Sequence, residues 1–195
     1  MGIFKLLLRV RPRRSARPAV SHNDGTPIRS VRRKFLLQGE EYSVSLKPDA
    51  TRNGLTVRDS TLVVSLCPAT RENFDRFLRD WYRRQARKTF QAAIERWLPL
   101  FAEAGYEVPA PRLKIFAMRR AWGRCYYTKG LVTLNLHLVK TPPACIDYIV
   151  LHELCHFVVS NHSQAFHRLV ESFLPTWRET DAQLKAFARA HRVIG

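Results

Sequence analysis

The sequence lacks three features that would assign it to large classes of protein. It contains no run of about 18 apolar residues, so we expect no membrane-spanning helix. It contains no GxxxxGK[ST] motif, which argues against a phosphate-binding P-loop. Its cysteines form no CxxC pair, which argues against a disulfide framework and a thiolate zinc site; they are Cys67, Cys125, Cys145 and Cys155. We therefore expect reduced, buried cysteines in a cytoplasmic protein.

Acidic residues are also few. The chain has 16 Asp and Glu against 33 Lys and Arg, which gives a formal net charge of +17. Such a field attracts polyanions, and nucleic acid is one candidate partner. The alternative interpretation is that an arginine-rich composition raised the charge without any binding role, since arginine far outnumbers lysine.

The composition changes once along the chain. Residues 1–32 are basic and contain prolines, and we interpret them as a flexible leader. From residue 33 the pattern is that of a folded protein, and its length suits one domain with a sizeable core. We expect a single domain over 33–195, built from a β-meander (33–68), a long helix (70–101) and a core segment (112–195).

The first half of this domain alternates between apolar and polar residues. "KFLLQGEEYSVSL" and "GLTVRDSTLVVSL" each predict a hairpin, and together they predict a small antiparallel meander. A helical pattern then begins at Thr70, whose hydroxyl can cap the first turn. One face of this helix carries a row of basic side chains, which we interpret as a solvated face: Arg76, Arg79, Arg83, Arg84, Arg87 and Lys88.

The second half predicts strands followed by helices. "RLKIFAM" reads as a strand, and "RCYYTKGLVTLNLHL" as a hairpin that turns at Gly130. Thr141 and the two prolines after it predict the start of a helix that runs from about 142 to 159. Asn161 can end that helix in a left-handed conformation. Two further helices are expected over 163–174 and 176–191.

The segment "HELCHFVVSNH", residues 152–162, carries the chemistry. His152 and His156 are four residues apart, so on a helix both imidazoles lie on one face and can bind one zinc ion. Glu153 lies beside the first histidine and can act as a general base toward a water that zinc acidifies. This is the HExxH pattern of zinc hydrolases.

A catalytic zinc site needs a third protein ligand. His162 is our first candidate, because a chain reversal at Asn161 would turn it back toward the other two histidines. His167, Glu171 and Glu179 are the rival candidates. Cys155 points away from the ligand face at helical spacing, so we interpret it as a core residue.

Several motifs together resemble the YgjP-like metallopeptidases, a branch of the zincin superfamily. The matching segments are "MRRAWGRC", "KGLVTLNLHLVKTPP", "IDYIVLHELCHF" and "NHSQAF", in the same order and spacing over most of the chain. The resemblance implies an α+β fold, with an antiparallel sheet and the HExxH helix in a zincin-like core. It also implies that His152, His156 and His162 bind Zn²⁺ and that Glu153 is the base.

The chain departs from the family pattern in two places. Ala121 and Arg124 stand where the family usually has arginine and serine, and His167 stands where it usually has an aromatic residue. Neither change touches the expected metal ligands. Arg124 could change the mouth of a cleft, so substrate preference is not carried over from the family.

Three functions remain open from the sequence. The first is a zinc metallopeptidase, in which the strand over 131–138 forms the edge of the cleft and pairs with an extended polypeptide substrate. The second is metal-dependent hydrolysis of a phosphoanhydride, as in a nucleoside triphosphate. The third is a basic nucleic-acid-associated protein whose zinc is structural. We favour the peptidase, because three histidines and one glutamate suit zinc.

Overall fold

A computed structural model of the chain describes residues 27–32, 34–47 and 51–194. Residues 1–26 of the predicted leader lie outside these ranges. The described residues form two compact units, one up to Tyr82 and the other from Arg83 onward. Both units combine helix with strand, so the predicted α+β class is confirmed. In the part of the chain that the structure describes, no helix is both long and apolar enough to cross a bilayer.

The first unit contains a four-stranded sheet in the order β1-β2-β4-β3. Both predicted hairpins form, with Gln38 and Asp59 at positive φ in their turns. The prediction of an antiparallel meander was wrong in one respect, because β2 and β4 pair in parallel and β3 lies at the edge. Local alternation predicts a strand but not its neighbour. The strands are β1 (Phe35–Leu37), β2 (Glu40–Lys47), β3 (Gly54–Arg58) and β4 (Thr61–Ser65).

The long helix α1 (Arg71–Glu103) is confirmed within two residues at each end. The Thr70 hydroxyl accepts a hydrogen bond from the backbone N–H of Asn73 at 3.3 Å, as a capping residue does. In the first unit, the ring of Phe74 on this helix meets Phe35 edge-on, with centroids 6.0 Å apart. The helix continues through Pro99.

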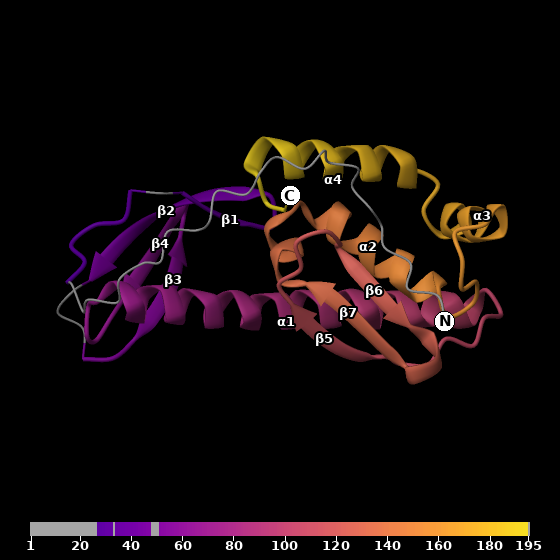
Figure 1. Cartoon of the computed structure of the whole chain (residues 1–195), viewed down its shortest axis with the longest axis horizontal. Helices are drawn as coiled ribbons and strands as arrows, with labels where there is room; N and C mark the ends of the chain where they lie inside the picture. Colours follow the sequence, from indigo (N-terminus) through magenta and orange to yellow (C-terminus); the bar gives the residue numbers. More distant parts are fainter. Residues whose placement is uncertain (1–26, 33, 48–50, 195) are drawn as a thin grey trace. The chain divides into compact units, whose positions relative to one another are not determined.

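The second unit contains a three-stranded sheet in the order β5-β7-β6, which Figure 1 shows beside the helix α2. β6 and β7 form the predicted hairpin, which turns at Gly130 with φ of 56°. β5 pairs with β7 in parallel, so the expected antiparallel sheet is mixed instead. The three strands are β5 (Arg112–Phe116), β6 (Gly123–Tyr126) and β7 (Leu131–Asn135).

This strand order corrects the expected edge of the cleft. The strand over 131–138 was expected at the edge, but β7 lies between two neighbours and cannot pair with a substrate. It also ends at Asn135, where a 3₁₀ helix η2 (Leu136–Lys140) begins. The two edge strands are β5 and β6, and β6 is the one that packs against α2.

Three helices follow the sheet: α2 (Pro143–Cys155), α3 (Gln164–Phe173) and α4 (Trp177–His191). α2 starts as predicted, but Pro142 is its N-terminal cap and the Thr141 hydroxyl instead donates to the carbonyl of Leu138. α2 ends at Cys155, four residues before the predicted end. Asn161 does not adopt a left-handed conformation; its side-chain oxygen accepts the N–H of Ser163 ahead of α3.

A buried amide fixes the loop between β5 and β6. Asn135 is fully buried, and its side-chain nitrogen donates to the carbonyls of Met118 (2.8 Å) and Ala121 (2.7 Å). Its side-chain oxygen accepts the N–H of Met118 and of His137. One side chain thus ties the loop to the end of β7.

Replacing Asn135 by alanine should therefore destabilise the protein. The change leaves buried carbonyls without donors, and we expect a loss of about 3 kcal/mol in the free energy of unfolding. Denaturant titration would measure it. Asn161→Ala is the matched control, because Asn161 is exposed and makes one such bond. Equal losses in the two variants would contradict this role for Asn135.

Candidate metal centre

The helix α2 and the residue that caps its C-terminus, His156, provide three of the four predicted site residues. His152, Glu153 and His156 are only 3%, 3% and 6% exposed, on a helix whose other residues are mostly buried too. Polar groups with so little contact with water need partners. The partners found for these three define the site.

The fourth residue, His162, lies in the connection between α2 and α3. It approaches His152 and His156, so that one potential ligand atom from each histidine lies within 4.8 Å of the others. The Nε2 atoms of His152 and His162 are 2.9 Å apart. Two nitrogens on one tetrahedral zinc ion would be about 3.3 Å apart, given Zn–N bonds of about 2.0–2.1 Å. The donor set therefore fits a zinc ion with small adjustments.

Two contacts orient the imidazole rings. Nδ1 of His156 donates to the carbonyl of Val159 at 3.1 Å, which leaves Nε2 of that ring with its lone pair free for a metal. The ring of Phe166, from α3, packs against all three histidines with centroid distances of 4.8, 4.5 and 4.8 Å. Phe166 is completely buried and so forms an apolar wall for the cluster.

Burial keeps these imidazoles neutral. It lowers the pKa of His156 to about 4, with the carbonyl of Val159 opposing the shift and His162 adding to it. Burial, followed by the neighbouring histidines, holds the pKa of His152 well below its usual value. The pKa of His162 is lowered by burial and then by His167. Neutral imidazole is the form that binds a metal, so the three histidines are already in the protonation state that metal binding requires.

Glu153 points from α2 to the edge strand β6. The backbone N–H of Cys125 donates to its carboxylate, and the charge of Arg124 acts on it. Burial nevertheless raises the pKa of Glu153 to about 8, with those two groups opposing the rise. A carboxyl group with such a pKa can accept and release a proton near neutral pH.

Gly123 leaves the space that Glu153 occupies. A β-carbon at position 123 would lie 2.3 Å from Oε1 of Glu153 and 2.7 Å from its Cδ and Cγ. Contacts of that length do not occur in proteins, so any larger residue would push the carboxylate away. The glycine thus allows the close approach of β6 and α2.

The rival third ligands lie elsewhere. Glu171 pairs with Arg178, and Glu179 is exposed on α4. The ring of His167 stacks on that of Trp177, with centroids 5.3 Å apart. None of the three belongs to the histidine cluster found among residues 27–32, 34–47 and 51–194.

The cysteines are only partly as expected. All four are free thiols, but Cys67 is exposed and Cys125 half-buried, so the expectation that the cysteines are buried was wrong for these two. Cys155 is buried next to the histidines but outside their cluster, and burial followed by the charge of Glu153 raises its pKa. It therefore remains a protonated core residue.

The roles of Phe166 and Gly123 were not predicted. Both belong to the quoted motifs "NHSQAF" and "MRRAWGRC". A single sequence does not reveal that a phenylalanine lies against a distant histidine or that a glycine lies under a glutamate. The spacing of the metal ligands, in contrast, is a local signal.

Comparisons with known proteins identify the family of the chain. The model of one family, described as YgjP-like, metallopeptidase domain, matches residues 13–187. This range includes most of both units and the whole histidine cluster. No curated protein matches the chain.

Proposed function

This chain belongs to the YgjP-like metallopeptidase-domain family, and from that premise we propose that it is a zinc-dependent hydrolase acting on polypeptides. The observation that supports the proposal best is the buried cluster of His152, His156 and His162, with Glu153 beside it. Three neutral imidazoles around one point, with a carboxylate next to them, make a donor set that suits zinc.

His152, His156 and His162 would hold the ion, and Glu153 would be the base. When bound, zinc would polarise a carbonyl group and lower the pKa of water. Glu153 accepts the proton of the attacking water and passes it to the leaving amine. Phe166 excludes water from the rear of the imidazoles.

The edge strand β6 is the proposed place for the substrate backbone. β6 has a strand neighbour on one side only, and Glu153 meets it at Gly123 and Cys125. A polypeptide in extended conformation that adds to this edge would run past the carboxylate. This proposal replaces the strand over 131–138 that we expected from the sequence.

Removal and return of zinc test the proposal. Dialysis of the full chain against a chelator should abolish hydrolysis of an unfolded polypeptide, and about one equivalent of Zn²⁺ should restore it. Zinc content and peptide release would be followed in the same samples. Peptide release that persists without metal would rule out a zinc peptidase.

Gly123→Ala should impair catalysis while leaving zinc bound. The added methyl group displaces Glu153 but not the histidines, and misplacing a catalytic group can cost about 100-fold in rate. The measurements are kcat/KM and zinc content. Gly54→Ala is the control, because its β-carbon would meet only Ser65 at an ordinary 3.9 Å. Unchanged kcat/KM in Gly123→Ala would show that the position of Glu153 is not critical.

Hydrolysis of a phosphoanhydride is the second candidate. It is favoured by Arg124, a cation whose charge acts on Glu153 and which could neutralise a phosphate oxygen. The same base would then activate water toward phosphorus. The two candidates differ in their products, which a single assay can separate.

A further inference from the structure

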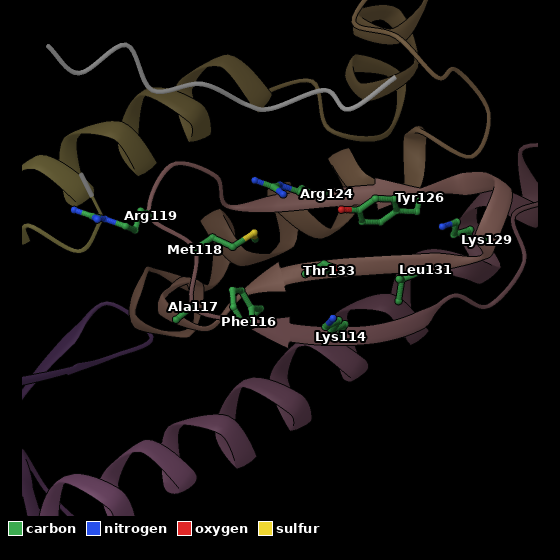
Figure 2. A pocket seen from close by; sticks show the side chains of 10 residues that line it. All are labelled: Lys114, Phe116, Ala117, Met118, Arg119, Arg124, Tyr126, Lys129, Leu131 and Thr133. Atoms are coloured by element: carbon green, nitrogen blue, oxygen red, sulfur yellow. The ribbon is translucent and has the colours of Figure 1, made fainter. Parts of the chain in front are cut away.

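The three-stranded sheet bears a cavity of about 580 Å³ on one face, seen in Figure 2. Its lining comes from all three strands, from the loop between β5 and β6, and from the η1 turn (Tyr127–Lys129). The size is in the range of pockets that hold small ligands or a single nucleotide unit. Its lining includes Lys114, Phe116, Arg119, Arg124, Tyr126 and Lys129.

Strand pairing sets the distance between the cationic residues that line this cavity. Lys114 on β5 and Arg124 on β6 are both paired with Thr133 on β7, so they flank it in one row across the sheet. Neighbouring strands are about 4.8 Å apart, so the backbones of Lys114 and Arg124 are about 10 Å apart. Alternate residues point to the opposite face, where Gly123 packs on Glu153. The cavity therefore lies on the face of β6 opposite Gly123, although the charge of Arg124 still reaches Glu153.

The cavity is strongly cationic. Two lysines and two arginines line it, and no carboxylate does. None of these four cations forms an ion pair with another of the residues that the structure describes. Nε of Arg124 is buried and has no hydrogen-bond partner among those residues. Four cations around one hollow favour an anion with several charges.

The same surface exposes an aromatic ring. Phe116 is 60% exposed, the largest exposed fraction among the large apolar side chains described. It lies on the cavity face between Lys114 and the loop that carries Arg119 (Figure 2). Asn135 holds that loop in place through Met118 and Ala121. A ring and fixed cations on an open sheet face can stack a base and bind its phosphates.

We propose that this face binds single-stranded nucleic acid. Bases of a single strand are free to stack on Phe116, while Lys114, Lys129 and Arg119 bind the phosphates. A duplex keeps its bases stacked inside, so it cannot use the ring. An acidic polypeptide would use the cations but has no planar group for Phe116. The net charge of +17 would draw a strand to the protein, and the cavity would position it.

Fluorescence anisotropy with the full chain tests this proposal. The probe is a labelled 12-nucleotide oligothymidylate, with a 12-base-pair duplex and a 12-residue polyglutamate as competitors. Lys114→Glu combined with Lys129→Glu should weaken binding more than tenfold at physiological salt. The number of counterions released on binding, measured from the salt dependence of the affinity, should fall by about two. The matched control is Arg87→Glu with Lys88→Glu on α1, two exposed cations whose reversal changes the net charge equally. It should weaken binding less than threefold.

A second pair of variants tests the stacking. Phe116→Ala should weaken binding about fivefold or more, since a base stacked on an aromatic ring contributes measurably to affinity. Leu100→Ala, which removes another exposed apolar side chain, should change nothing. Zinc content and thermal unfolding are compared for every variant. If the double lysine reversal fails to fold, Lys114→Gln and Lys129→Gln, measured singly, replace it.

Three results would overturn the proposal. Equal losses in the two charge-reversal pairs would mean that the overall charge, and not the cavity, binds the strand. Full affinity in Phe116→Ala would exclude stacking. Competition by the duplex or by polyglutamate as strong as that by the unlabelled strand would assign the face to another partner. The outcome does not depend on the reaction at the histidine cluster.

Discussion

His162→Ala is expected to lose its zinc while it remains folded. With two histidines left, the affinity for Zn²⁺ should fall by more than about 100-fold, a larger effect than that of losing a supporting contact. The reason is geometric, because His162 brings a ligand atom within 4.8 Å of those of His152 and His156. Competition with a chromophoric chelator would give the affinity, and circular dichroism the fold.

His167→Ala is the matched control. It removes a histidine five residues away that stacks on Trp177 and lies outside the cluster, so zinc should be retained. If His162→Ala bound zinc as tightly as the wild type, the third ligand would have to be another residue, with Glu171 and His167 as the remaining candidates. The proposed coordination would then be wrong.

Glu153→Gln is expected to reduce kcat/KM by about 10²- to 10⁴-fold, the usual contribution of a general base. Glutamine has the same shape as glutamate, and its side-chain oxygen can still accept the N–H of Cys125. It cannot accept the proton of water. Steady-state kinetics on a polypeptide substrate would measure the loss.

The variant must keep its metal for this result to count. We expect the zinc content of Glu153→Gln to equal that of the wild type, since Glu153 is not among the three clustered histidines. Glu171→Gln, which removes a carboxylate paired with Arg178, should have full activity. Full activity in Glu153→Gln would exclude Glu153 as the base and leave a structural zinc as the better interpretation.

Local sequence patterns predicted most of the elements. The helices, both hairpins and the turn at Gly130 follow from spacing and turn chemistry that a few neighbouring residues determine. The approach of His162 to the other two histidines was predicted as well. The expected cause was wrong, since α2 ends at Cys155 and Asn161 caps the next turn instead of reversing the chain in a left-handed conformation.

The sequence did not predict which distant strands pair with one another. The parallel pairings of β2 with β4 and of β5 with β7 join segments whose own patterns only say that they are strands. The position of β6 at the edge follows from the second of these pairings. The gap at Gly123 and the ring of Phe166 depend on packing between distant segments, which a single sequence does not encode in any short motif.

One product analysis tests the central claim most directly. Zinc-loaded wild type and Glu153→Gln would each be incubated with a mixture of unfolded polypeptide and nucleoside triphosphates, and the products identified by mass spectrometry. A zinc peptidase that uses Glu153 predicts new peptides from the wild type alone. Nucleotide products from the wild type alone, or identical products from both proteins, would contradict it.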